Sequence, residues 1–166
     1  MAFMICEKRQ SVIDERGHAL VIGGPGSGKT TLALLKSKGI VDALALGQSI
    51  LFLSYSRAAV QQILKRCREI LTKEEMKGID VRTYHSFCWD ILHCHGRLLG
   101  GRPLKMMAPS DEGTRRTQFD GDWAAERRRL KDEDGMVCFD LFADATAELF
   151  EGSTHLRSWM GRLFPL

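Results

Sequence analysis

The stretch Gly23-Gly-Pro-Gly-Ser-Gly-Lys-Thr30 decides the fold that we predict for this chain. Its spacing is G-x-x-x-x-G-K-[ST], the pattern of a loop that holds the phosphates of a nucleoside triphosphate. Backbone N–H groups can surround such dense negative charge only where no Cβ blocks the approach, and the glycines of the stretch allow this. We expect Lys29 to contact the β- and γ-phosphates and the Thr30 hydroxyl to bind Mg²⁺.

The sequence on either side of this loop fits a strand and a helix. His18–Ile22 is a short apolar run, typical of a buried strand in a parallel sheet, and we expect the strand over 19–23. Thr31–Leu35 begins a helix whose positive N-terminal end would point at the phosphates. A chance glycine-rich turn is the alternative, and the order of strand, loop and helix argues against it.

Composition limits the class of protein. The 166 residues suffice for one domain with a sizeable core, or for a fragment of something larger. The net charge of +3 permits a polyanion partner without arguing for one. No apolar stretch reaches the roughly 18 residues that span a bilayer, and no signal peptide is evident, so we expect no membrane partner. The five cysteines include no Cys-x-x-Cys pair and indicate reduced thiols in a cytoplasmic protein.

Two further apolar runs, 50–54 and 79–83, predict parallel strands that would complete a three-stranded sheet with helices on both faces. Ser54–Arg57 and Thr83–Ser86 follow these strands. Ligand contacts in open α/β sheets collect at such carboxyl ends. Ser56 is the expected N-cap of the next helix, in which apolar residues recur at helical spacing.

Helical spacing predicts the remaining elements. We expect helices over 6–15, from the loop to about Leu46 with Gly47 as C-cap, after Thr83, over 122–131, from Asp140 to Gly152, and after Ser153. Arg127–Arg129 precedes Asp132–Asp134, which indicates either a solvated, locally neutralised face or a phosphate-contacting patch. Cys88 and the nearby His93–His95 match no zinc spacing, and a buried thiol with a partly buried histidine is the favoured interpretation.

A phosphate-binding loop of this kind needs an acid at the end of a second core strand to hold Mg²⁺ and orient water. Met136–Asp140 has four apolar residues followed by an acid, but Asp140 also begins a periodic helix, so a helix N-cap is the favoured interpretation. The other possibility is that the strand is missing, with Leu163–Leu166 as its beginning.

Taken together, four segments resemble the N-terminal part of a UvrD/Rep-type superfamily 1 DNA helicase. They are Gln10 with Val12-Ile13, Gly23–Thr30, Ile50–Arg57 with the following helix, and Thr83–Phe87 with Ile91-Leu92. In that order they resemble the family's Q motif, Walker A motif, motif Ia and motif Ib. The resemblance covers roughly the first 100 residues, and residues 136–166 resemble the helices that precede the family's Walker B strand.

This resemblance implies an α/β fold, a P-loop NTPase (RecA-like) parallel sheet with flanking helices. We expect it to be incomplete, with an ATP-binding core over 1–99, a short, mostly helical insertion over 100–135, and helices leading to a missing Walker B strand over 136–166. The implied activity is that of an ATP-dependent helicase, with a place in DNA repair. It would move on single-stranded or partly duplex DNA and couple ATP hydrolysis, with Mg²⁺, to strand separation.

The resemblance also assigns site residues. Lys29 and Thr30 would act in catalysis, and Thr30 would bind Mg²⁺. The residues assigned to ATP binding are Gln10, which would contact adenine, Gly23, Gly24, Pro25, Gly26, Ser27, Gly28, Lys29, Thr30 and Thr31. The residues assigned to DNA are Tyr55, Ser56, Arg57, Thr83, Tyr84 and His85. An exposed helical glutamine for Gln10, and packing under the sheet for the two tyrosines, are the alternatives.

The sequence departs from the family pattern in two ways. Motif Ia commonly reads Thr-Phe-Thr-Asn followed by Lys or Arg, whereas here Ser54-Tyr-Ser-Arg57 precedes Ala58. The Asp-Glu motif, the γ-phosphate sensor and the second RecA-like domain are not found. We therefore expect the 166-residue chain alone to be inactive and prone to self-association. A small P-loop kinase, with Arg115-Arg116 in a lid, and a non-hydrolysing nucleotide-binding module stay open.

Overall fold

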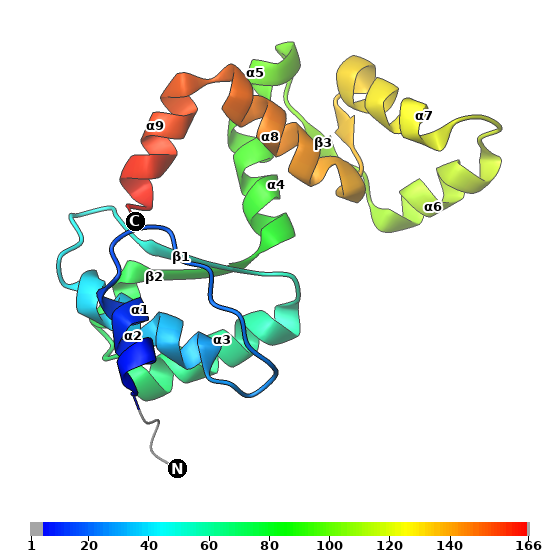
Figure 1. Cartoon of the computed structure of the whole chain (residues 1–166). Coiled ribbons are helices and arrows are strands. Elements are labelled where there is room, and N and C mark those ends of the chain that lie inside the picture. The colour runs from blue at the N-terminus through cyan, green and yellow to red at the C-terminus, as the bar shows by residue number, and fades with distance from the viewer. Residues whose placement is uncertain (1–4, 166) are drawn as a thin grey trace. The chain divides into compact units, whose positions relative to one another are not determined.

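The computed structural model describes residues 5–165 and divides them into two compact units (Figure 1). Unit 1 is the described part of Met1–Thr83 and of Trp159–Leu166, and unit 2 is Tyr84–Ser158. Across residues 5–165, no helix is both long and apolar enough to cross a membrane.

Unit 1 is built on a short parallel sheet. Strands β1 (Ile50–Ser54) and β2 (Ile79–Thr83) pair in parallel, with Ile50 opposite Ile79 and Ser54 opposite Thr83. Both strands occur at the predicted residues. Because the strands are parallel and in this register, they end together at their carboxyl edge.

Two helices cover one face of this sheet. They are α2 (Lys29–Val41) and α3 (Arg57–Ile70), and Figure 1 shows both on the same side of the sheet. Their shared core is Leu34, Cys67 and Leu71, packed against Phe52 and Val81 of the strands. The other face carries an ion pair between Asp80 and Arg82 and a Leu53 side chain that is 41% exposed. Within the described residues, this sheet is therefore not covered by helices on both faces as predicted.

The strand predicted before the loop is wrong: residues 18–24 form no strand. Leu20 and Ile22 are each 86% exposed, although the apolar run predicted that they would be buried. A strand exists through hydrogen bonds to a neighbour, and among residues 5–165 β1 pairs only with β2. The unit 1 sheet of the described chain thus has two strands instead of three.

The other helical elements of unit 1 are α1 (Glu7–Asp14), a 3₁₀ turn η1 (Glu75–Gly78) and the end of α9 (Thr154–Leu163). Helix α2 ends at Val41, earlier than predicted, because turns at Ala43 and Leu44 replace its hydrogen bonds. Gly47 has the left-handed φ of +85° but lies in a turn beyond the helix and does not cap it. The predicted cap of α3 is confirmed, since Ser56 Oγ accepts a hydrogen bond from the Ala59 N–H at 3.1 Å.

Unit 2 is mostly helical. It contains α4 (Tyr84–His95), α5 (Arg97–Gly100), β3 (Lys105–Met106), α6 (Pro109–Gln118), α7 (Trp123–Arg129), a π turn η2 (Leu130–Asp134), β4 (Met136–Val137), a 3₁₀ turn η3 (Phe139–Leu141) and α8 (Phe142–Gly152). Helices α4 and α8 pack together, with Phe142 almost fully buried and its ring 5.2 Å from that of Trp89. Strands β3 and β4 form a separate two-residue parallel pair.

The predicted charged helix in the insertion is confirmed. Asp122 caps α7 by accepting a hydrogen bond from the Ala124 N–H at 2.9 Å. Leu130 is fully buried in a cluster with Met107 and Cys138, against which Trp123 packs. Burial raises the pKa of the Cys138 thiol to about 11. Helix α6 was not predicted, because its sequence is almost entirely polar.

The arginine cluster of α7 is neutralised locally. Arg129 contacts Glu126 at 2.8 Å and Glu133 at 2.8 Å, and these hydrogen bonds raise the pKa of Arg129. Asp140 is not a helix N-cap, contrary to prediction. Its carboxylate accepts a hydrogen bond from Arg127 at 2.6 Å, while α8 begins at Phe142 without a side-chain cap. The ion pair with Arg127, which is distant in sequence, holds the carboxylate instead.

The exposed run of residues 20–22 generates a prediction about association. An extended segment outside any strand, with exposed apolar side chains, favours pairing with a second copy, so residues 1–166 should self-associate as their concentration rises. Changing Leu20 and Ile22 together to Lys should shift the chain towards monomer in sedimentation velocity. Leu46→Lys is the matched control, because Leu46 is fully exposed but lies in a turn. A wild-type chain that stays monomeric at every concentration would contradict this.

Thr72 and Glu75 generate a prediction about pH. The Thr72 N–H donates to Glu75 Oε2 at 2.6 Å and the Glu75 N–H donates to Thr72 Oγ1 at 3.2 Å, a capping box for η1. The hydrogen bond from Thr72, helped by Lys38, lowers the pKa of Glu75. The charged form therefore stabilises the fold above the ordinary glutamate pKa, and this stabilisation is lost as pH falls through the folded value.

Glu75→Gln should lower the melting temperature measured by circular dichroism at pH 7. The gap to wild type should close on acidification, because the wild type then loses the same charge. Glu74→Gln is the control, since the Glu74 side chain is 79% exposed and pairs with Lys77. A gap that stays constant down to acidic pH would show that the carboxylate charge is not involved.

Candidate nucleotide-binding site

The glycine-rich loop precedes α2 directly. Gly26 and Gly28 have φ of +75° and +85°, a left-handed conformation that costs glycine nothing, and Gly28 is the N-cap of α2. A Cβ on Gly23 would lie 2.6 Å from Ser27 Oγ, too close for any other residue unless Ser27 moved. The loop therefore depends on its glycines for shape, and it leads into the positive end of a helix of 13 residues.

The Lys29 side chain folds back over its own loop. Its Nζ donates hydrogen bonds to the carbonyl oxygens of Gly23 at 2.5 Å and Gly24 at 3.0 Å. Ser27 Oγ lies 3.4 Å from the same nitrogen. The loop thus holds a cation at its centre, and this ammonium would be available to a phosphate group once it left the two carbonyl oxygens.

Thr30 and Thr31 lie in the first turn of α2, with Thr30 exposed beside the loop. Mg²⁺ in nucleotide sites usually takes one or two protein ligands and completes its shell with phosphate oxygens and water. The Thr30 hydroxyl fits the role of one such ligand. Among the described residues, no group of three His, Cys, Asp or Glu side chains gathers to hold a metal by itself. An Mg²⁺ here would therefore depend on the nucleotide phosphates.

Helix α1 lies beside α2 in unit 1 (Figure 1). Gln10, the predicted adenine contact, is exposed, and its Nε2 donates to Asp14 Oδ1 at 2.9 Å. Its neighbour Arg9 reaches the loop, where Nη2 donates to the Ser27 carbonyl at 3.3 Å. From α2, Lys36 Nζ donates to the Val12 carbonyl at 2.9 Å and to that of Glu15. Sequence reasoning missed these two cationic contacts, since neither residue belongs to a motif.

The carboxyl edge of the β1–β2 sheet carries the motif Ia residues. Tyr55 follows β1 directly and is 87% exposed. Ser56 caps α3, and Arg57 is the exposed first residue of that helix. Because Ser54 lies opposite Thr83 in the parallel register, the structure brings these three residues to the edge where β2 also ends.

In unit 2, the two predicted motif Ib residues of α4 belong to a group of rings. The His85 ring stacks on that of Phe139, with centroids 4.0 Å apart and planes 10° from parallel. Tyr84 meets His85 edge-on at 6.0 Å. Tyr84 is 36% exposed and Phe139 42%. Sequence reasoning missed Phe139, because its apolar type at the start of a periodic helix indicates core packing.

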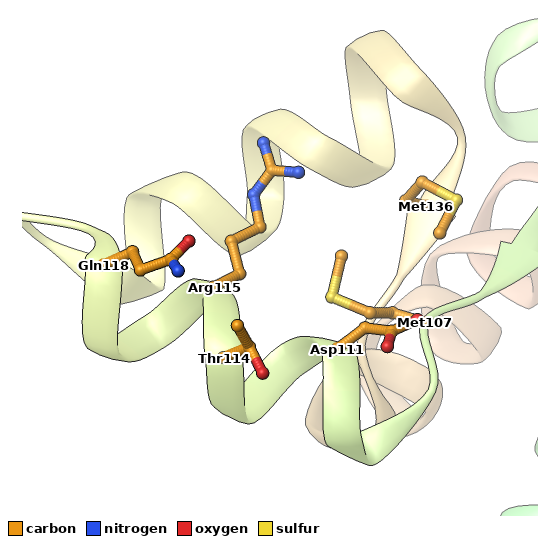
Figure 2. Close-up of a pocket in the computed structure, with 6 residues that line it drawn as sticks. All are labelled: Met107, Asp111, Thr114, Arg115, Gln118 and Met136. Atoms are coloured by element: carbon orange, nitrogen blue, oxygen red, sulfur yellow. The ribbon is translucent and has the colours of Figure 1, made fainter.

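Unit 2 also has an open pocket of about 410 Å³ between α6 and β4 (Figure 2). Its lining residues are Met107, Asp111, Thr114, Arg115, Gln118 and Met136. Figure 2 shows Arg115 reaching from α6 towards α7, where its guanidinium lies 3.3 Å from Glu126. The lining residues include no hydroxyl or thiol paired with a histidine, so the pocket suggests no nucleophilic chemistry.

Comparison with known proteins decides the family. Residues 4–153 match the family described as UvrD/REP helicase N-terminal domain. The chain belongs to this UvrD/Rep family. The match includes the glycine-rich loop and the Tyr55 and Tyr84 segments described above.

Individual relatives of the UvrD/Rep family are also similar to this chain. The ATP-dependent DNA helicase UvrD1 of Mycobacterium leprae (strain TN) is 30% identical over 96 residues, which is 57% of this chain and 12% of that protein. A probable DNA helicase II homolog of Mycoplasma pneumoniae (strain ATCC 29342 / M129 / Subtype 1) is 32% identical over 92 residues, 55% of this chain and 13% of that protein. The matched part of the chain thus corresponds to about an eighth of the length of either relative.

A third relative combines two activities in its name. It is an ATP-dependent helicase/nuclease protein of Lactobacillus helveticus (strain DPC 4571), which is 29% identical over 104 residues, 52% of this chain and 9% of that protein. All three names specify a helicase, in agreement with the family match.

Proposed function

We propose that this chain is the first ATP-binding part of an ATP-dependent DNA helicase, which binds MgATP at the loop 23–30 and moves on single-stranded DNA. The observation that carries the proposal is the loop itself. Glycines with left-handed φ place Lys29 at the centre of a backbone ring at the start of α2. The family match over residues 4–153 supports DNA as the second ligand.

In this proposal the phosphates lie where the Lys29 ammonium now contacts two carbonyl oxygens. The loop N–H groups and the N-terminal end of α2 stabilise the negative charge, and Lys29 turns from its own loop to the β- and γ-phosphates. Thr30 provides a hydroxyl ligand for Mg²⁺, which neutralises developing charge between those phosphates.

DNA lies along the carboxyl edge of the β1–β2 sheet in this proposal. The exposed Tyr55 ring offers a face for a base, and base–aromatic stacking contributes about 1–3 kcal/mol without reading sequence. Arg57 supplies a cation for a backbone phosphate. Tyr84 and His85 contribute from α4, and Phe139 fixes the plane of the His85 ring by stacking on it.

The hydrolysing acid is not assigned within the described residues. Asp140, the candidate from sequence, is held in an ion pair with Arg127 at 2.6 Å in unit 2. We therefore propose that residues 1–166 bind nucleotide but turn it over slowly, and that an acid elsewhere in the full protein completes the site.

The test of nucleotide binding is Lys29→Met. Loss of a charged contact to the phosphates should weaken MgATP binding about ten- to hundredfold in isothermal titration calorimetry. Lys65→Met, which removes an exposed charge from α3, is the control and should bind as wild type does. If Lys29→Met binds MgATP as tightly as wild type, the loop is not the nucleotide site.

DNA binding is tested separately, by fluorescence anisotropy with labelled single-stranded oligonucleotides at several salt concentrations. Tyr55→Ala should weaken binding by about 1–3 kcal/mol and leave the salt dependence unchanged, because stacking releases no counterions. Arg57→Ala should lower the slope of log K against log salt by about 0.7. A strong preference for one base sequence, or an unchanged slope in Arg57→Ala, would contradict this placement of the DNA.

A further inference from the structure

Helix α1 carries Gln10 but has little apolar packing of its own. None of the residues from Glu7 to Asp14 is buried, and Val12 and Ile13 are only half-buried. A helix of eight residues is marginal in water unless tertiary contacts hold it. The position of α1 therefore depends strongly on its polar contacts.

The first polar contact comes from Lys36 of α2. Its ammonium donates to the carbonyl oxygens of Val12, at 2.9 Å, and of Glu15, the residue that follows the helix. The last carbonyls of a helix have no partner within it and form its negative end. Lys36 thus satisfies two of these acceptors and places a positive charge where the helix dipole favours it.

The second polar contact comes from Arg9, in the middle of α1. Its Nη2 donates to the carbonyl oxygen of Ser27, inside the phosphate-binding loop, at 3.3 Å. Helix α1 is therefore joined to the loop by Arg9 and to the helix that follows the loop by Lys36. Gln10 is next to Arg9, so both contacts set its distance from the loop.

We propose that Arg9 and Lys36 are positioning residues that hold α1 against the loop, so that the Gln10 amide meets the adenine of a nucleotide whose phosphates the loop binds. This inference rests on the proposed function. A glutamine amide offers one donor and one acceptor, which complement N7 and the N6 amino group of adenine but not the two acceptors, N7 and O6, of guanine. Selection of ATP over GTP then requires α1 to be fixed relative to the phosphates.

The test compares dissociation constants for MgATP, MgGTP and inorganic tripolyphosphate, measured with residues 1–166. Lys36→Met and Arg9→Ala should each lower the preference for ATP over GTP about three- to tenfold, the value of an oriented hydrogen bond. Tripolyphosphate affinity should not change, because the loop remains intact. Lys36→Arg should retain the preference, since a guanidinium can also donate to two carbonyls.

Two matched controls come from the same helices. Lys38→Met removes a charge from α2 that contacts the Ile70 carbonyl at 3.3 Å instead of α1. Lys8→Ala removes the charge adjacent to Arg9 in α1. Both controls should keep the wild-type preference for ATP.

A second measurement needs no nucleotide. Hydrogen exchange of the α1 amides should be faster in Lys36→Met than in wild type, with exchange in α3 unchanged. Equal exchange in α1, or a variant that keeps the wild-type preference for ATP, would overturn the inference. So would a wild type without base preference, or variants that lose tripolyphosphate affinity. A wild type that binds none of the three ligands would instead refute the proposed function.

Discussion

Burial of Leu34 between the β1–β2 sheet and α3 is the interaction on which the candidate site depends. Leu34 is fully buried with Cys67 and Leu71, and Phe52 and Val81 pack against this cluster. Because Leu34 lies five residues after Lys29, its burial fixes the beginning of α2 relative to the sheet. The loop is consequently held from its helical side, even though the residues before it form no strand in the described chain.

The parts of the fold that sequence could predict are those determined by local pattern. Strands β1 and β2 are short apolar runs, and α3 has a regular apolar stripe with Ser56 in place to cap it. The glycine-rich loop is equally local, because its conformation follows from residue type. The capping box of Thr72 and Glu75 also had a readable pattern, T-x-x-E, and sequence reasoning overlooked it.

The parts that sequence could not predict depend on partners distant along the chain. His18–Ile22 is as apolar as a buried strand, but pairing needs a neighbour that no local pattern reports. Asp140 is chemically suited to cap α8, and only the fold shows that Arg127 competes for it. The contacts of Arg9 and Lys36 with the loop and with α1 belong to the same class, as does the stacking of Phe139 on His85.

A structure of residues 1–166 with a non-hydrolysable ATP analogue and Mg²⁺ tests the central claim most directly. Our account predicts that the Lys29 ammonium leaves the carbonyl oxygens of Gly23 and Gly24 and contacts the β- and γ-phosphates. It also predicts that the Thr30 hydroxyl binds Mg²⁺ and that Gln10 contacts the adenine. An analogue bound elsewhere, with Lys29 still on the two carbonyl oxygens, would contradict the assignment of the loop as the nucleotide site.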